Sequence, residues 1–448
     1  MSKLYLGVDW GTHSSKWSCS VGDRDYLRRM PTFYSELLHE NGELTFAPSE
    51  ERWAKSEDNL RRSLKGVLIH DPLGASFWNS VREDTGTSLG EAVAFSLCCL
   101  LADAKRQIST HTEVKEFADV ELGFSFPNWV VEQGRSAKAA SKHFQEAVAV
   151  AVELMCRFGV DDLPRPDRPF KISEWRAQVK EVLSAIPANN DSALTVENIT
   201  QRSFQSRDES IRYRFLMESG AAGLPYLRAL KLEGRPGLAG LSKLLVVDVG
   251  AGSTDVGYML RVQHIKTAKE NLYFFPPAPS FNVAGNELTN DIIHYHRAKG
   301  EPMTWARAEA QKLQTTNWAQ LPFVDTWKKR ICGHVWEYVC GIPDFRWLPM
   351  PVPLNVVLTG GSGLVSGLST AVKEAVLSAL EVRQVPLATL QSVVIRGDHL
   401  PHLNFAAEAD YAKRAVCLGA ADRDKPGFRY MEKMDAPFKV QVAANRWV

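Results

Sequence analysis

Two short stretches of the chain combine an aspartate with glycines and hydroxyl residues in the same order. One spans residues 9–16 and the other residues 248–255. A Gly and Ser/Thr turn at the end of a buried strand leaves backbone N–H groups unpaired in one concavity, which suits phosphate oxygens. The side chains of Asp9, Asp248 and Asp255 are hard oxygen ligands, suited to Mg²⁺ or to its shell of water. The sequence therefore predicts two phosphate-binding turns with magnesium held mainly through water.

A lysine and a third glycine turn extend this pattern. Lys16 follows Asp9 by seven residues and is placed to neutralise the charge of a β- or γ-phosphate. Residues 360–363 read Gly-Gly-Ser-Gly and follow an apolar run predicted as a strand over 355–359. One such turn is most often an ordinary hairpin turn, but three of them favour a nucleotide. The chain contains neither GxxxxGK[ST] nor GxGxxG, which excludes the P-loop and Rossmann classes of nucleotide site.

The elements that position the first two turns are predicted as β-hairpins. Residues 4–9 form an apolar, buried-strand run, and residues 16–21 alternate between apolar and polar after the turn. Residues 243–248 and 256–262 repeat the same order of apolar strand, aspartate, glycine turn and second strand. An internal duplication is the simplest explanation.

Four other regions have recognisable patterns. A helix is predicted from Ser88, which forms a capping box with the glutamate three residues later, and another over 136–158. Residues 162–214 are rich in Pro, Arg, Asp, Asn and Ser, and are predicted as a helical, mostly solvated insertion or lid, and as a candidate contact surface. The Trp-rich stretch 318–347 is predicted as the core of a small lobe, with an exposed partner-binding face as the alternative.

The composition excludes several classes of protein. Lys and Arg total 53 and Asp and Glu total 52, so the net charge of +1 offers no general attraction for nucleic acid or anionic membranes. With 45% apolar residues in 448, the chain is expected to form two or more domains. The seven cysteines show neither CxxC pairs nor zinc spacing, and indicate reduced thiols in a cytoplasmic protein. No apolar stretch reaches the ~18 residues of a membrane span.

With these motifs in this order, the chain resembles the actin-like ATPase superfamily, and most closely the nucleotide-binding part of the DnaK-type heat-shock chaperones. Residues 4–17 look like the first phosphate motif of that family, residues 244–257 like the second, and residues 355–366 like the adenosine motif. The helices predicted over 217–230 and 411–422 are similar to its two connecting helices. The five motifs cover the chain from residue 4 to about residue 421.

Weaker matches add further residues. The segment around Lys65 looks like the one that carries the family's catalytic lysine, and Gly285 lies in a stretch that resembles GGEDFD. Glu309 and Lys312 match the pair that flanks adenine in the family. By matched position, the nucleotide-binding residues are Gly11, Thr12, His13, Lys16, Gly250, Ala251, Gly252, Ser253, Thr254, Gly285, Glu309, Lys312, Gly360, Gly361 and Ser362.

The resemblance also implies catalytic roles. The three aspartates would organise Mg²⁺ and its waters, while Lys65 and Glu218 would position the attacking water. The catalytic set implied by the resemblance is thus Asp9, Lys65, Glu218, Asp248 and Asp255.

The fold implied by the resemblance is α/β, the actin-like ATPase or ribonuclease-H-like architecture. It has two lobes, each built on a duplicated five-stranded mixed sheet with flanking helices, and Mg-ATP or Mg-ADP in the cleft between them. On this basis lobe I is expected over 1–240, lobe II over 241–424 and a tail over 425–448. Lobe I would contain an inserted subdomain at about 32–118, and lobe II a helical subdomain at about 285–350.

The chain also departs from the chaperone pattern. His13 stands where chaperones commonly have a second threonine, Ala251 replaces a glycine, and Leu364 replaces an arginine of the adenosine motif. Lys16 is instead a feature of actin and of the plasmid-segregating filament proteins. The first phosphate motif therefore combines features of two branches of the superfamily.

The function predicted first is a DnaK-like, ATP-hydrolysing conformational switch that acts on a dedicated protein partner. The resemblance ends soon after the second connecting helix, so we expect no peptide-binding domain. The protein would be a monomer or part of a hetero-complex, with no direct nucleic-acid or membrane partner. The alternative is an actin-like, ATP-dependent filament protein, and a small-molecule kinase or a pseudo-ATPase is less favoured.

Overall fold

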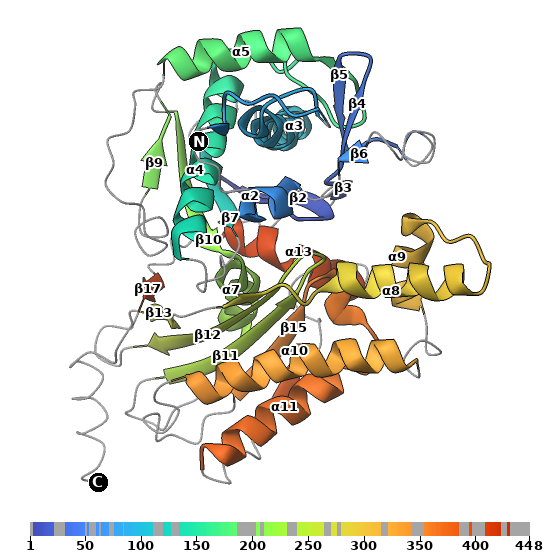
Figure 1. Cartoon of the computed structure of the whole chain (residues 1–448). Helices are drawn as coiled ribbons and strands as arrows, with labels where there is room; N and C mark the ends of the chain where they lie inside the picture. The colour runs from blue at the N-terminus through green and yellow to red at the C-terminus, as the bar shows by residue number, and fades with distance from the viewer. Residues whose placement is uncertain are drawn as a thin grey trace. The chain divides into compact units, whose positions relative to one another are not determined.

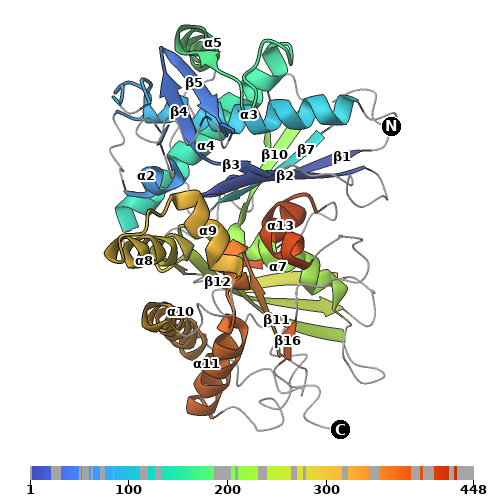
Figure 2. The ribbon, with the colours of Figure 1, turned by 90° about the vertical axis from the view of Figure 1, so that its right-hand side faces the viewer.

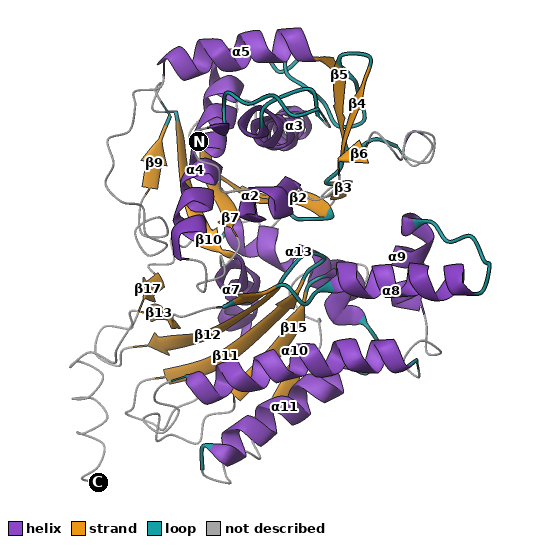
Figure 3. Cartoon of the chain, in the orientation of Figure 1, coloured by secondary structure: helices purple, strands orange, loops and turns teal. Residues whose placement is uncertain are grey.

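The computed structural model divides the chain into two units, residues 1–217 with 420–423 and residues 218–419 with 424–448. Both units are α/β, each with a mixed β-sheet and flanking helices (Figure 1, Figure 3). The residues that the structure describes are 3–21, 32–49, 52, 60–61, 64–70, 76–83, 85–110, 120–126, 134–185, 203–206, 210–230, 240–263, 270–275, 279–314, 321–342, 354–384, 394–396, 408–422 and 428–430.

The central sheet of unit 1 contains both strands of the first predicted hairpin. In spatial order its strands are β3 (Thr32–Tyr34), β2 (Ser14–Val21), β1 (Leu4–Asp9), β7 (Val120–Phe126), β10 (Ile211–Met217) and β9 (Ser203–Gln205). β2 is antiparallel to β1 and β3, whereas β7 is parallel to β1 and to β10. β9 is antiparallel to β10 at the edge.

The sheet of unit 2 contains the second predicted hairpin. Its strands in spatial order are β16 (Val394–Arg396), β15 (Leu354–Thr359), β11 (Gly240–Val249), β12 (Thr254–Gln263), β13 (Glu270–Phe275) and β17 (Phe428–Tyr430), and β14 (Ser280–Phe281) also pairs with β12. β12 is antiparallel to β11 and β13, whereas β15 is parallel to β11 and to β16.

The two sheets repeat one topology. β3–β2–β1–β7–β10 of unit 1 and β13–β12–β11–β15–β16 of unit 2 have the same spatial order, the same order along the chain and the same strand directions. In both sheets, the first two strands along the chain form an antiparallel hairpin. The first strand of that hairpin also pairs, on its other edge, with the first of two parallel strands. The repeat supports the internal duplication predicted from the sequence.

The helices of unit 1 include both that were predicted. They are α2 (Leu64–His70), α3 (Leu89–Ser109), α4 (Gly134–Arg157) and α5 (Ile172–Ala185). The capping box of α3 is confirmed, since the Glu91 backbone N donates to Ser88 Oγ and the Ser88 backbone N donates to the Glu91 carboxylate. Trp17 Nε1 of β2 donates to Asp103 Oδ2 of α3 over 2.9 Å, which ties this helix to the sheet.

A second, smaller sheet accompanies these helices in unit 1. Its antiparallel strands are β6 (Leu60–Arg61), β4 (Leu37–Glu40), β5 (Glu43–Phe46) and β8 (Phe170–Lys171), in that order. Three of them come from the predicted subdomain at about 32–118, and the fourth comes from the polar segment that precedes α5. This sheet therefore joins two regions that the sequence analysis treated separately.

The interpretation of residues 162–214 as a mostly solvated insertion needs correction. Trp175 of α5 is fully buried, with its indole ring edge-on to Phe95 at 5.2 Å. Ile211 and Tyr213 are also buried, because residues 211–217 form β10 inside the central sheet. The parts of this segment at 186–202 and 207–209 lie outside the described residues. Removing residues 165–212 would therefore remove α5 and the first residues of a central strand.

The helices of unit 2 cover both faces of its sheet. They are α7 (Glu218–Ala229), α8 (Gly285–Ala298), α9 (Trp305–Gln314), α10 (Pro322–Gly341), α11 (Leu368–Val382) and α13 (Glu408–Ala420). Leu245 and Val247 of β11 belong to one core with α10 and α11, which lie side by side (Figure 2). Val246, between these two residues of β11, points to the opposite face of the sheet, as strand alternation requires, and borders Gly223 of α7.

The Trp-rich stretch contributes to that core where the structure describes it. Trp327 of α10 is 2% exposed, and its Nε1 donates to the Ala284 carbonyl over 2.9 Å. Trp336 packs against the same core. Trp318 and Trp347 lie outside the described residues. The prediction of a core role is thus confirmed for Trp327.

The boundary between the units differs from the predicted division at residue 240. The first connecting helix, predicted over 217–230, is α7 and belongs to unit 2, because it packs on β11 and β12. The second, predicted over 411–422, is α13, whose last residue returns to unit 1. There a Cβ at Gly123 would overlap the Ala420 carbonyl, and Arg214 Nη2 donates to the Asp422 carbonyl over 2.7 Å.

Among the described residues, the structure contains no helix with the length and apolar character needed to span a membrane.

Candidate functional site

The first predicted phosphate turn closes the β1–β2 hairpin of unit 1. Asp9 is the last residue of β1 and is paired across the strands with Lys16. Both side chains are buried, and Lys16 Nζ donates to Asp9 Oδ2 over 3.1 Å. Ser125 Oγ, near the end of β7, donates to Asp9 Oδ1 over 3.4 Å. These partners hold the Asp9 carboxylate in place, and Lys16 neutralises its charge inside unit 1.

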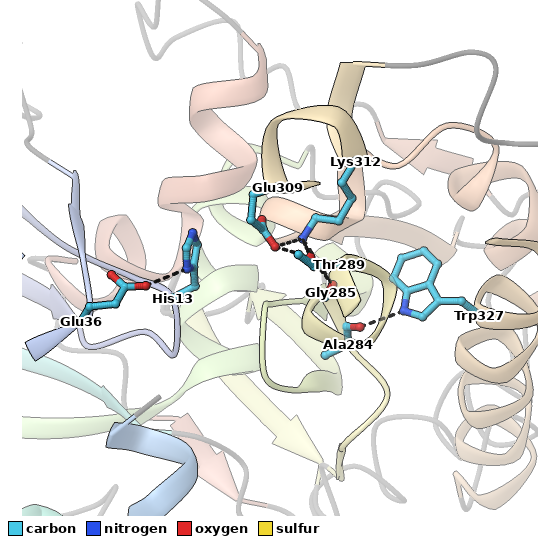
Figure 4. A network of polar contacts seen from close by, with 8 residues as sticks. All are labelled: His13, Glu36, Ala284, Gly285, Thr289, Glu309, Lys312 and Trp327. Carbon is cyan, nitrogen blue, oxygen red and sulfur yellow. Dashed lines mark hydrogen bonds and ion pairs between the residues drawn. The ribbon is translucent and has the colours of Figure 1, made fainter. Parts of the chain in front are cut away.

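The turn between these strands is tight and half-buried. A Cβ atom on Gly11 would overlap the Ser14 carbonyl, so the absence of a side chain lets the backbone fold back on itself. Thr12 and His13 follow at the tip of the turn. His13 Nδ1 lies 3.2 Å from Glu36 Oε1, and Figure 4 shows the two side chains pointing toward each other.

The second predicted phosphate turn closes the β11–β12 hairpin of unit 2. Asp248 pairs across the strands with Asp255, and both are buried, at 6% and 1% exposure. The Gly250 N–H donates to the Ser253 carbonyl over 2.9 Å, which closes the turn. Ser253 Oγ donates to Asp255 Oδ2 over 2.8 Å. The other predicted residues of this turn are Ala251 and Gly252, which are half-buried, and Thr254, which is buried at the start of β12.

The two hairpins carry different charges at equivalent positions. Asp9 faces Lys16, whereas Asp248 faces Asp255. Side chains directly opposite in an antiparallel pair have Cβ atoms ~5 Å apart, and two like charges there repel each other. A divalent cation, or water bound to one, would relieve that repulsion, so the residue types fit magnesium at the second turn. Within the described ranges, no group of three or more His, Cys, Asp or Glu side chains is arranged to hold a metal ion.

The second turn is fixed to the start of α8. The Gly285 N–H donates to the Gly250 carbonyl over 3.0 Å, and the Asn286 N–H donates to the Ala251 carbonyl over 2.7 Å. These are N–H groups of the first turn of a helix, which have no partner inside the helix itself. The predicted phosphate turn and the predicted GGEDFD-like stretch therefore form one block.

The third glycine turn lies against the same block. Gly360 follows β15 with a φ of 82°, a conformation that favours glycine. A Cβ atom there would overlap Asp248 Oδ1 and the Val249 carbonyl. Gly361–Leu364 then form a short 3-10 helix in which Ser362 is buried. Parallel pairing of β11 with β15, which places Asp248 beside Thr359, brings the second and third turns together.

A polar cluster, buried except for the half-buried Glu309, joins α8 to α9 (Figure 4) and lies against the third turn. Lys312 Nζ donates to Glu309 Oε1 over 2.8 Å, to Thr289 Oγ1 over 3.2 Å and to the Gly285 carbonyl over 3.4 Å. Thr289 Oγ1 also donates to Glu309. A Cβ on Gly285 would overlap Ser362 Oγ, so this glycine allows the third turn to approach α8. The Glu and Lys predicted to flank adenine are thus ion-paired with each other.

The two residues predicted to position the attacking water are both buried. Lys65 lies on α2 of unit 1 and is 4% exposed, and Glu218 is the first residue of α7 in unit 2 and is 5% exposed. The position of Glu218 suits a carboxylate, because the N-terminus of a helix stabilises negative charge.

The structure adds residues to the site that sequence reasoning missed. Ser125 reaches Asp9 only because β7 pairs with β1, and its own sequence carries no signal beyond the end of a strand. Thr289 lies one helical turn after Gly285 in a stretch already singled out, so helical spacing could have identified it. Glu36 comes to His13 through the pairing of β2 with β3, which the sequence analysis did not predict.

The predicted site residues fall into two sets. Unit 1 holds Asp9, Gly11, Thr12, His13, Lys16 and Lys65, and unit 2 holds all the others. Within unit 2, the second turn, the third turn and the Lys312 cluster are in direct contact. No family model matches the chain, and no curated protein matches it.

Proposed function

We propose that the chain binds Mg-ATP and hydrolyses it, and that hydrolysis switches its conformation toward a dedicated protein partner. The observation that carries the proposal is the repeated topology, in which an aspartate is the last or the next-to-last residue of the first strand along the chain in each sheet and faces the residue seven positions later. A duplicated sheet of this order, with phosphate turns in both hairpins, is what the resemblance to the actin-like ATPases implies.

The contacts within unit 2 support a nucleotide as the ligand. The second turn presents glycine and hydroxyl residues beside buried carboxylates, which suits phosphate and its cation. Gly360 brings the third turn against Asp248, and Gly285 brings Ser362 against the Lys312 cluster. These are the segments that the resemblance assigns to phosphate and to adenosine.

The chemistry of the two hairpins suggests a division of roles. Bound Mg²⁺ would supply positive charge to the phosphate oxygens. Asp248 and Asp255 would hold the ion through its water ligands, since two buried carboxylates face each other there. Lys16 would supply the positive charge of the first hairpin and keep Asp9 in a fixed position. Lys65 and Glu218 are the residues proposed to orient the attacking water.

Two Asp→Asn variants would test the proposal, one in the proposed magnesium site and one in an exposed ion pair. Asp255→Asn removes a carboxylate from the second turn, whereas Asp325→Asn removes one from the exposed Asp325–Lys329 pair on α10. We expect the wild type and Asp325→Asn to bind Mg-ATP and release phosphate at equal rates. We expect Asp255→Asn to lose about 10²-fold in turnover, the scale for removal of one electrostatic group from a reacting site.

Measurements on the same samples distinguish an ATPase from the alternative functions, which are a pseudo-ATPase, a filament protein and a small-molecule kinase. Absence of ATP binding by the folded wild type, or full activity of Asp255→Asn, would refute the ATPase proposal. Tight binding without phosphate release would point to a pseudo-ATPase, and ATP-dependent light scattering above a critical concentration would point to a filament protein. ATP consumption that requires an added sugar or acid would point to a small-molecule kinase.

A further inference from the structure

Glu36 is a buried carboxylate beside the first phosphate turn. It is 2% exposed, lies between β3 and β4, and has its Oε1 3.2 Å from His13 Nδ1. Its second oxygen, Oε2, is also buried and has no hydrogen-bond partner among the described residues. A buried carboxylate is costly unless a cation or a hydrogen-bond donor compensates it. The imidazole of His13 is the compensating group shown by the structure.

The backbone around this pair is held in place from both sides. The Ser35 N–H donates to the His13 carbonyl over 2.8 Å, and the Ala47 N–H donates to the Glu36 carbonyl over 3.0 Å. The hydroxyls of Ser15 and Ser35 form a buried hydrogen bond of 2.7 Å. The tip of the turn is therefore joined to the strand connection that carries Glu36, which fixes where the carboxylate meets the ring.

The contact with Glu36 uses only one of the two nitrogens of the His13 ring. The two imidazole nitrogens lie on opposite sides of the ring, so Nε2 points away from Glu36 when Nδ1 contacts it (Figure 4). The His13 side chain is 17% exposed, and the Tyr34 ring lies beside it with centroids 5.3 Å apart. When both nitrogens are protonated, Nδ1–H donates to Glu36 and Nε2–H is a directed donor at the turn.

From this geometry, and resting on the proposed function, we infer that Glu36 is a positioning residue that holds His13 as a ligand of a nucleotide phosphate. His13 then takes the place of the threonine that is common at this position in the chaperones that the first motif resembles. Nε2–H contributes a charge-assisted hydrogen bond to a phosphate oxygen, and Glu36 supplies both the orientation and the compensating charge.

Calorimetric titration with Mg-ATP at constant pH and salt tests this inference. The variants are Glu36→Gln, His13→Gln and the double variant, and Glu40→Gln is the control because Glu40 is a carboxylate of the neighbouring β4. We expect each single variant to weaken binding about tenfold, the scale of one hydrogen bond to a charged group. The double variant should lose no more than a single one, since the two residues act as one unit. Glu40→Gln should stay within about twofold of the wild type.

A spectroscopic measurement separates this inference from the proposed function. In the nucleotide-free protein, nitrogen NMR of the His13 ring, assigned with His13→Gln, should show an Nδ1 resonance that moves in Glu36→Gln and stays in Glu40→Gln. Mg-ATP should then shift Nε2 in the wild type. An unmoved Nδ1 resonance, or additive losses of affinity with normal ATP binding by the wild type, would overturn the role of Glu36 alone. A folded wild type with the Nδ1 signature but no ATP binding would instead overturn the proposed function, and the phosphate role of His13 with it.

Discussion

Replacing Lys16 with methionine tests how far the first hairpin depends on its buried ion pair. The Lys16 and Asp9 side chains are only 8% and 9% exposed, and their charged atoms are 3.1 Å apart. Removing one partner of such a pair leaves an uncompensated buried charge, at a cost of roughly 3–5 kcal/mol. Ser125 still donates to Asp9 in the variant, so we expect the lower end, a loss of about 3 kcal/mol in the free energy of unfolding.

The measurement is urea unfolding of the full chain followed by circular dichroism, with a matched lysine as control. Lys329 forms an ion pair of similar length, 3.0 Å to Asp325, but it is 79% exposed, so Lys329→Met should change stability by less than ~0.5 kcal/mol. The double variant Asp9→Asn/Lys16→Met carries no buried charge at this position and should recover at least half of the loss. A Lys16→Met loss as small as the control's, or a double variant less stable than Lys16→Met, would refute the reasoning.

Three further perturbations follow from single contacts. Gly360→Ala should destabilise unit 2 more than Gly300→Ala, because both glycines have positive φ but only Gly360 has atoms where a Cβ would lie; the φ cost alone is about 1 kcal/mol, and thermal unfolding compares the two. Burial lowers the pKa of Lys243 to about 8 from 10.5, so the unfolded chain binds more protons between these values and stability should rise with pH there. Lys243→Met should remove that rise and stabilise the protein at pH 7, as urea unfolding at several pH values would reveal. Trp327→Phe leaves the buried Ala284 carbonyl without its indole donor and should cost about 1–3 kcal/mol, measured in the same way.

Local patterns predicted the elements whose periodicity was strong. The capping box at Ser88 and the two glycine hairpins were found because their signals lie within a few residues of one another. β10 was missed although Ile211 and Tyr213 are buried in alternation, because Arg212 and Arg214, which alternate with them, and the polar residues before them are typical of a solvated segment. Its burial depends on β7, about ninety residues earlier.

The residues of the candidate site also differ in how far the sequence could predict their grouping. The aspartates and glycines of each turn are contiguous in the sequence, so their grouping could be predicted. The partners of His13 and Asp9 could not, because Glu36 and Ser125 reach them through strand pairings between distant segments. The ion pair between Glu309 and Lys312 is a helical neighbour contact, and only its burial required the tertiary structure.

The return of the chain to unit 1 at Ala420–Arg423 has a consequence for synthesis on the ribosome. A nascent chain that has just passed Met217 has made every central strand of unit 1 but lacks the carbonyl groups of Ala421 and Asp422, which accept from Ser20 Oγ and Arg214 Nη2. Domains usually fold from the N-terminus as they emerge. Here these hydrogen bonds of unit 1 can form only after some two hundred further residues are made, so residues 218–419 of unit 2 are translated before unit 1 is complete.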